Sequence, residues 1–174
     1  MILLINGPFG VGKTTVARLL IRRLPRSTLF DPEWVGLGLR FLGSTTADFQ
    51  DDPRWVRHVV RGARLLSALG RDLVVPITLW RAETYSAIVD GLSPALSLCL
   101  TASEPILSAR IARGDPKPAA WRQAHLPQCL TAFTDDRLGR RLATDRLSAD
   151  QLADRIETVW LSELARLGPG SRGA

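Results

Sequence analysis

Several residue types are scarce in this chain of 174 residues, and each scarcity excludes a class of protein. The two cysteines, Cys99 and Cys129, are too few for a disulfide framework or a cysteine-rich metal cluster. Cys99 lies in an apolar run and is predicted to be a core residue. No apolar run approaches the about 20 residues of a membrane span, and the N-terminus lacks the basic segment of a signal peptide. These features favour a reducing, cytoplasmic location.

Lysine and histidine are also rare. Lys13 and Lys117 are the only lysines, so arginine supplies most of the net charge of +6. A basic protein can bind anionic ligands, nucleic acid or a membrane surface, but a solvated basic surface explains the same excess. The arginines are scattered over several predicted helices, so we expect no nucleic-acid partner. His58 and His125 are isolated and are expected to be surface or packing residues.

The remaining composition is that of one globular domain. Hydrophobic residues make up 45% of the chain and charged residues 23%, values typical of a folded protein. A chain of this length can bury a core without disulfides or metals. We expect residues 1–167 to form a single domain and residues 168–174 to form a loose tail.

The clearest motif lies near the N-terminus. Ile2 to Ile5 is an apolar run typical of a buried strand in a parallel sheet. It leads directly into Gly-Pro-Phe-Gly-Val-Gly-Lys-Thr, residues 7–14, which matches G-x-x-x-x-G-K-[ST] at every fixed position. Apolar residues then recur at helical spacing. Strand, glycine loop and helix together predict a phosphate-binding P-loop.

Such a loop directs backbone N–H groups and the positive end of a helix at one centre. We therefore predict that ATP binds to a set of contiguous residues: Gly7, Pro8, Phe9, Gly10, Val11, Gly12, Lys13, Thr14 and Thr15. Lys13 would reach the β- and γ-phosphates, and the Thr14 hydroxyl would coordinate Mg²⁺.

Strands and helices alternate along the rest of the chain, which predicts an α/β fold with a parallel sheet. Further strands are predicted at residues 27–31, 73–78, 96–101 and 141–145, with helices at 32–42, 53–69, 82–90, 103–113, 119–133 and from 148. We expect a P-loop NTPase fold of the nucleotide-kinase type, with a doubly wound five-stranded sheet. Pro76 cannot donate to a sheet, so the third strand is predicted to fray or bulge there. Thr78 and Trp80 would then lie in a loop at its carboxyl end, where ligands of such folds bind.

Motifs that the sequence lacks exclude two classes of P-loop protein. A GTPase would need an Asn-Lys-x-Asp segment, but Asn6 is the only asparagine. A large ATPase motor would need a carboxylate at a strand end, and the third strand ends in Pro-Ile-Thr. A small-molecule kinase fits better. Arg110 and Arg113 would then stabilise the transferring phosphate or contact adenine, although a solvated helix face also explains them. The break at residues 114–118 resembles a short lid.

Transfer to a hydroxyl needs a group that orients that hydroxyl. Asp31 is the predicted group, because it ends the strand that we expect beside the P-loop strand. Asp31-Pro-Glu is also an N-cap pattern, and the two roles are compatible. Glu33 would help to hold the metal through water. Arg40, Phe49 and Trp80 are candidates for lining an acceptor pocket.

Arginines on the helix predicted at residues 53–69 leave two interpretations open. They recur at spacings of three and four residues: Arg54, Arg57, Arg61 and Arg64. They would form either a solvated face or a basic stripe that holds an anionic acceptor.

Four sequence blocks, taken together in their order along the chain, resemble the tunicamycin-resistance ATP-binding proteins of bacteria. They are residues 5–14, Asp31-Pro-Glu with Gly36 and Leu39-Arg40, Asp48-Phe-Gln, and Val75-Pro-Ile-Thr. The resemblance covers residues 2 to about 160. It implies a nucleoside-kinase-like fold that binds Mg-ATP and confers resistance to tunicamycin, a uridine-containing nucleoside antibiotic.

By the same resemblance the drug would bind in a cleft with four residues: Asp31, Arg40, Phe49 and Thr78. A peripheral membrane contact through a C-terminal amphipathic segment is also implied. Three functions stay open at this point: phosphorylation of the antibiotic, ATP-dependent sequestration without transfer, and a metabolic small-molecule kinase.

Overall fold

The computed structural model describes residues 1–44, 46, 48–114 and 116–167. Within these ranges, five parallel strands form one sheet in the order β2-β3-β1-β4-β5. The strands are β1 (Ile2–Asn6), β2 (Ser27–Leu29), β3 (Asp72–Pro76), β4 (Ala95–Thr101) and β5 (Arg140–Ala143). The helices are α1 (Lys13–Arg23), α2 (Pro32–Phe41), α3 (Pro53–Ala68), α4 (Ala82–Leu92), α5 (Glu104–Ala112), α6 (Pro116–Ala132) and α7 (Ala149–Leu167). Two short 3₁₀ segments are η1 (Phe49–Asp51) and η2 (Asp136–Leu138).

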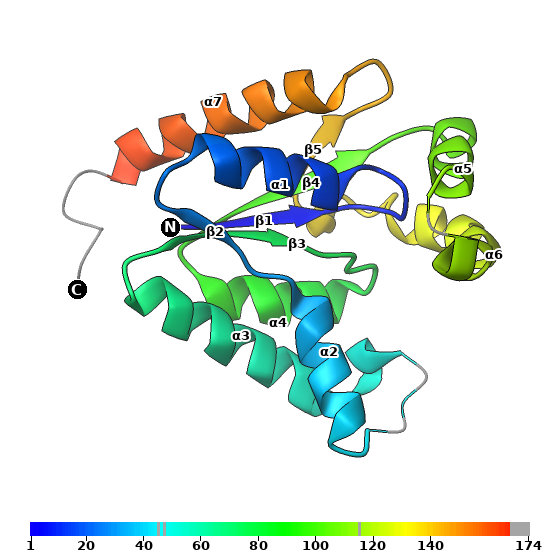
Figure 1. Cartoon of the computed structure of the whole chain (residues 1–174), viewed down its shortest axis with the longest axis horizontal. Coiled ribbons are helices and arrows are strands. Elements are labelled where there is room, and N and C mark those ends of the chain that lie inside the picture. Colours follow the sequence, from blue (N-terminus) through cyan, green and yellow to red (C-terminus); the bar gives the residue numbers. More distant parts are fainter. Residues whose placement is uncertain (45, 47, 115, 168–174) are drawn as a thin grey trace.

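Helices cover both faces of the sheet (Figure 1). Side chains alternate along β1, so Leu3 and Ile5 pack with α1 and α7 while Ile2 and Leu4 pack with α3 and α4. All five residues of β1 are buried, as expected for the central strand of a parallel sheet. The predicted doubly wound P-loop architecture is therefore confirmed.

Pro76 does not disrupt β3, which corrects one prediction. It is buried, and it lies opposite Ile5 in the register between β3 and β1. Successive N–H groups of β3 point alternately to β1 and β2: Leu73 donates to Met1, and Asp72 donates to Arg26. The missing N–H of Pro76 falls on the β2 side, beyond the end of that short strand. Thr78 and Trp80 nevertheless lie in the loop after β3, as predicted.

Two other expectations were wrong. The strand that precedes Asp31 is not beside the P-loop strand, because β3 lies between β2 and β1. The lid-like break is shorter than predicted, since α6 begins at Pro116 rather than at residue 119. Proline is tolerated in the first turn of a helix, where its missing N–H would be unpaired in any case. Asp115 and the predicted tail, residues 168–174, lie outside the described residues.

The strands all end at the side of the molecule that carries the P-loop, α5 and α6 (Figure 1). The helix α2 projects from the layer of α3 and α4 and begins at this same end. None of the described helices combines the length and the apolar character needed to cross a membrane.

Candidate active site

The P-loop connects the end of β1 to the first turn of α1. Gly7 has a φ of +149° and Gly10 has a φ of +76°, values that other residues rarely adopt. A Cβ atom at Gly7 would also lie 2.6 Å from the Leu100 carbonyl oxygen. Gly12 is the N-cap of α1 and brings no capping side chain, so the first N–H groups of this helix lack a side-chain partner. They are suited to bind a phosphate.

Lys13 folds back onto this loop. Its ammonium group donates to the carbonyl oxygens of Gly7 at 2.8 Å and Pro8 at 2.9 Å. Burial lowers the pKa of Lys13 to about 8; Glu33 opposes this shift and Arg122 adds to it. The ammonium group is thus held at the loop and interacts with two charged side chains that come from α2 and α6.

A first cavity of about 400 Å³ lies over the P-loop, and we call it the nucleotide cavity. Its lining includes every P-loop residue from Phe9 to Thr15. Its lining also includes Thr144 and residues just before and at the start of α7. Of the predicted ATP-binding residues, all except Gly7 and Pro8 line this cavity.

The two arginines predicted to contact the nucleotide differ in position. Arg110 lines the nucleotide cavity and donates to the carbonyl and hydroxyl oxygens of Thr144, both at 3.2 Å, and to the Val11 carbonyl at 3.5 Å. It therefore ties the P-loop to the loop before α7. Arg113 is exposed and lines neither this cavity nor the second one.

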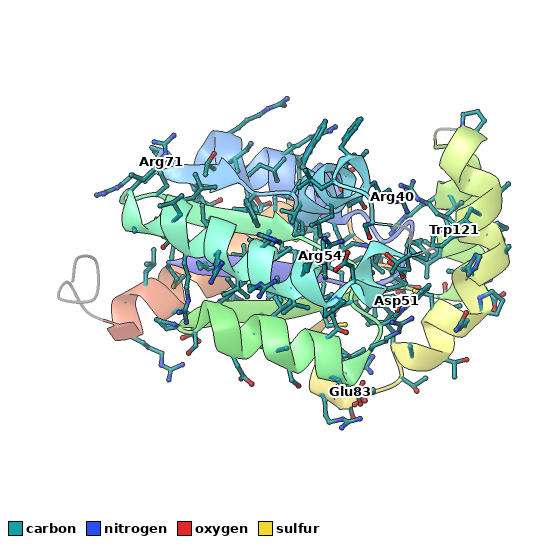
Figure 2. All side chains as sticks on the ribbon, turned by 90° about the horizontal axis from the view of Figure 1, so that it is seen from below. Arg40, Asp51, Arg54, Arg71, Glu83 and Trp121 are labelled. Carbon is teal, nitrogen blue, oxygen red and sulfur yellow. The ribbon has the colours of Figure 1, made fainter. Side chains whose placement is uncertain are left out.

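A second cavity of about 420 Å³ adjoins the first, and we call it the acceptor cavity. Its lining comes from segments that lie far apart in the sequence: Phe9, Pro32, Glu33, Arg40, Asp48, Gln50, Trp55, Pro76, Ile77, Thr78, Trp80, Trp121 and Arg122. Arg40 on α2 and Trp121 on α6 lie at the same end of the molecule (Figure 2). Three predicted acceptor residues, Arg40, Thr78 and Trp80, are thus brought together. The side chain of Phe49 lies outside the described part of the chain.

Aromatic rings form one wall of the acceptor cavity. Phe9 of the P-loop meets Trp80 edge to face at a centroid distance of 5.6 Å, and it meets Trp121 in the same way at 5.4 Å. Trp121 also stacks on His125 at 4.2 Å. Such a wall suits an acceptor that carries a ring or another flat, partly apolar group.

Among the described residues, four line both cavities: Phe9, Glu33, Thr78 and Arg122. They mark the junction where a phosphate in one cavity would meet an acceptor in the other. Glu33 is the carboxylate at the junction and Arg122 is the guanidinium. A carboxylate can orient or deprotonate a hydroxyl, and a guanidinium can stabilise the charge of a transferring phosphoryl group.

Asp31 does not reach this junction. Its carboxylate caps α2 by accepting the Glu33 N–H at 3.0 Å, and it lines neither cavity. The N-cap pattern is confirmed, whereas the predicted role in orienting the hydroxyl has no support from its position. The arginine stripe of α3 is not part of either cavity lining; Arg54 pairs with Asp52, and Arg64 donates to the Gly91 carbonyl.

Hydrogen bonds hold the loops around the junction in place. The Asn6 amide is fully buried and makes four: it donates to the carbonyls of Leu79 and Leu138 and accepts from the N–H groups of Gly7 and Leu79. It therefore ties the start of the P-loop to the loop after β3. Gln50 donates to the Thr78 carbonyl at 3.0 Å, and an ion pair joins Arg81 to Asp51.

The donor set fits Mg²⁺ bound together with ATP. Mg²⁺ takes oxygen ligands and is usually held by one or two protein groups plus phosphates and water. Thr14 is exposed and lines the nucleotide cavity, and Glu33 adds a carboxylate. Among the described residues, no cluster of three or more His, Cys, Asp or Glu side chains forms a metal site without a nucleotide.

Both cysteines are buried, as predicted for Cys99. Burial raises the pKa of each thiol, to about 11 for Cys129. The thiols are therefore protonated at neutral pH and are not suited to act as nucleophiles.

Sequence reasoning missed Trp121 and Arg122. Both lie on a helix whose pattern carries no motif, and they reach the cavities only because α6 packs at the carboxyl end of the sheet. Glu33 was noted as a metal ligand through water, but its place between the two cavities was not foreseen. Phe9 was assigned to ATP alone, whereas it also forms part of the acceptor wall.

No protein-family model matches the chain, and no curated protein sequence matches it. Solved structures do. The tunicamycin resistance protein of Deinococcus radiodurans is 24% identical, with a TM-score of 0.77 over 91% of this chain and 94% of that one. A sugar kinase from a Janibacter species is 16% identical, with a TM-score of 0.67 over 92% and 94%. A shikimate kinase from Bacteroides thetaiotaomicron is 13% identical, with a TM-score of 0.64 over 92% and 98%.

These neighbours share the fold of this chain, and two of them are kinases that act on small molecules. The predicted resemblance to a tunicamycin resistance protein is confirmed at the level of the fold. The chain therefore has an α/β P-loop fold of the small-molecule-kinase type, in which a nucleotide cavity and a second cavity meet at Glu33, Thr78 and Arg122.

Proposed function

We propose that this protein is an Mg-ATP-dependent phosphotransferase that phosphorylates a hydroxyl group of tunicamycin or a related nucleoside antibiotic. The observation that carries the proposal is the pair of adjoining cavities with four shared lining residues. A kinase must bring two substrates to a single point, and water must be kept from that point. The similarity to a tunicamycin resistance protein supports the choice of acceptor.

The residues at the junction have complementary roles in this reaction. The acceptor oxygen forms a bond to the γ-phosphorus while the bond from that phosphorus to the β–γ bridging oxygen breaks, and ADP leaves. Glu33 orients the hydroxyl and accepts its proton. Lys13, the P-loop N–H groups and Arg122 stabilise the phosphate charge.

Thr14 would hold Mg²⁺, which neutralises the phosphate oxygens when it is bound. The remaining acceptor groups position the substrate. The aromatic wall of Phe9, Trp80 and Trp121 receives its ring, and Asp48 and Arg40 contribute polar groups of opposite charge.

Two alternatives follow from specific observations. Drug sequestration without transfer is supported by the absence of a carboxylate at the end of β3, where Pro76 is followed by Ile77 and Thr78. A metabolic kinase is supported by the similarity to sugar and shikimate kinases.

The decisive experiment combines the purified protein with Mg-ATP and tunicamycin and follows the mass of the drug. The proposal expects a phosphate adduct that forms with the wild-type protein and not with Lys13→Met. If tunicamycin binds in the presence of ATP but its mass stays the same, the protein sequesters the drug. If tunicamycin neither binds nor gains phosphate, the protein is better explained as a kinase of a metabolic small molecule.

A further inference from the structure

Thr78 faces the junction of the two cavities because of the strand that precedes it. Ile77 donates to the Ile5 carbonyl at 3.0 Å, so the pairing with β1 continues one residue beyond the end of β3. Successive side chains of an extended chain point to opposite faces of a sheet. Ile77 and Leu79 are buried in the core on the side of α3 and α4, so Thr78 is directed to the other face, which α1 and the P-loop cover (Figure 1). There it lines both cavities.

The Thr78 hydroxyl is available to a ligand. Thr78 is half-buried, and within the described part of the chain its hydroxyl takes part in no hydrogen bond. A hydroxyl can donate one hydrogen bond. Such a bond is about twice as strong when it is made to an anionic phosphate oxygen as when it joins two neutral groups. A phosphoryl oxygen at the junction is therefore a better partner for this donor than a neutral oxygen of the second substrate.

Side-chain amides hold the backbone on both sides of this hydroxyl. The Gln50 amide donates to the Thr78 carbonyl at 3.0 Å. The Asn6 amide, which is fully buried, accepts the Leu79 N–H at 2.9 Å and donates to the Leu79 carbonyl at 3.1 Å. Contacts from β1 and η1 thus fix the position of Thr78. A donor that is held in place before the reaction needs no reorganisation when charge develops on the phosphoryl group.

An uncharged donor at this strand end suits phosphoryl transfer. Large P-loop ATPases place a carboxylate at a strand end beside the phosphates. Here β3 is followed by Ile77 and Thr78, and Glu33 already supplies a carboxylate at the junction. A second carboxylate would repel the γ-phosphate, whereas a threonine adds a hydrogen-bond donor without adding negative charge.

We infer that Thr78 is a catalytic residue whose hydroxyl donates a hydrogen bond to an oxygen of the γ-phosphoryl group during transfer. The hydroxyl keeps its proton throughout, because Glu33 accepts the proton of the second substrate. Asn6 and Gln50 act through Thr78 and are positioning residues. The inference rests on the proposed phosphotransfer, and it differs from the drug contact that the sequence predicts for the same side chain.

The test measures binding of a phosphoryl mimic in the absence of a second substrate. Mg-ADP alone and Mg-ADP with aluminium fluoride, which resembles the transferring group, are titrated by calorimetry. Thr78→Val removes the hydroxyl and keeps the branched side chain. It should weaken binding of the aluminium fluoride complex by about 10- to 100-fold, the effect of one hydrogen bond to a charged group. The affinity for Mg-ADP should not change, because ADP has no γ-phosphoryl group.

Three further variants sharpen the result. Thr78→Ser keeps the hydroxyl and should retain tight binding of the aluminium fluoride complex. Thr101→Val is the matched control, because Thr101 ends β4, the other neighbour of β1, is half-buried and lines neither cavity. It should bind both ligands as the wild type does. Gln50→Met should weaken binding of the aluminium fluoride complex severalfold although no second substrate is present, since its effect passes through Thr78.

Binding of the aluminium fluoride complex that is unchanged in Thr78→Val would overturn the inference, and a raised KM for tunicamycin in that variant would then assign the hydroxyl to the drug. An equal loss of Mg-ADP affinity, repeated in Thr78→Ala, would also overturn it and would assign Thr78 to the folding of the cavity. Phosphate transfer to tunicamycin is followed separately by mass. Transfer with unchanged binding of the mimic in Thr78→Val refutes only the role of Thr78, and lost binding of the mimic without transfer by the wild type refutes only the proposed reaction.

Discussion

The two cavities are nearly equal in volume but are built in different ways. Most of the nucleotide cavity comes from two short stretches, the P-loop at Phe9 to Thr15 and the segment at residues 144–152. The acceptor cavity is assembled from the P-loop, α2, η1, the start of α3, the loop after β3, and α6. Its walls are aromatic side chains and four charged groups of both signs. A local motif therefore specifies the nucleotide cavity, whereas tertiary packing specifies the acceptor cavity. Single substitutions can test whether the two cavities act separately.

The largest effect is expected at the nucleotide cavity. Among the described residues that line the two cavities, Lys13 is the only lysine, and in Lys13→Met the phosphotransfer kcat/KM should fall by about 10³-fold. Steady-state kinetics with Mg-ATP and tunicamycin measure it. Arg113→Met is the control, because Arg113 is exposed and lines neither cavity. A comparable loss in the Arg113 variant would restore the predicted nucleotide role of that arginine.

At the junction, Glu33→Gln should reduce kcat by about 10²-fold while ATP affinity stays nearly constant. Asp31→Asn should have little effect on kcat or on stability, since asparagine caps a helix about as well as aspartate. Asp31 is the N-cap of α2 and Glu33 lies in its first turn, so the pair is closely matched. If Asp31→Asn is the more damaging change for kcat, the assignment of the orienting group to Glu33 is wrong.

A smaller effect concerns pH and the nucleotide cavity alone. Lys13 is charged below its pKa of about 8 and neutral above it. ATP affinity should therefore fall by about tenfold between pH 7 and pH 9 if the charged form binds. Calorimetric titrations at the two pH values measure this, and Lys13→Met should remove the dependence. Identical affinities in the wild-type protein would mean that Lys13 stays charged at pH 9.

The same lowered pKa has the opposite consequence for folding. In the unfolded chain the pKa of Lys13 is near 10.5, so between about pH 8 and 10.5 the unfolded state binds more protons than the folded state. The free energy of unfolding should therefore gain a favourable contribution from Lys13 as pH rises through that window. Stability and nucleotide affinity thus change in opposite directions.

The smallest effect should be confined to the acceptor cavity. Trp121→Leu removes the edge-to-face contact with Phe9 and one aromatic wall, and acceptor affinity should fall by about fivefold. ATP affinity should not change, because Trp121 does not line the nucleotide cavity. Parallel titrations with each ligand measure the two constants. A matching loss of ATP affinity would show that the cavities are not separable at this residue.

The difference between the cavities also explains what the sequence could predict. The P-loop is a contiguous motif whose glycines and lysine have roles that depend on local geometry, so its residues could be assigned before the fold was known. Asp31 was correctly predicted as an N-cap for the same reason. Its neighbour Glu33 points to the junction because each helical residue turns by about 100°, and that direction has meaning only when the rest of the cavity is present.

Other features depend on the packing of distant segments. Pro76 fits β3 only because β2 ends before it, a fact that the residues around Pro76 do not contain. Trp121 and Arg122 have no motif, and their place follows from where α6 packs. The strand order, in which β3 lies between β2 and β1, also depends on how distant segments pack. Such contacts depend on tertiary structure and cannot be predicted from the local conformational preferences of the residues.

The γ-phosphate and the acceptor hydroxyl should meet where the two cavities join, at Glu33, Thr78 and Arg122. A crystal structure with tunicamycin and a non-hydrolysable ATP analogue bound together tests it most directly. We predict that an acceptor hydroxyl lies about 3 to 3.5 Å from the γ-phosphorus, with Glu33 in contact with that hydroxyl and Arg122 in contact with the phosphate. A drug that binds outside the acceptor cavity, or one whose hydroxyl groups all point away from the γ-phosphate, would contradict the account.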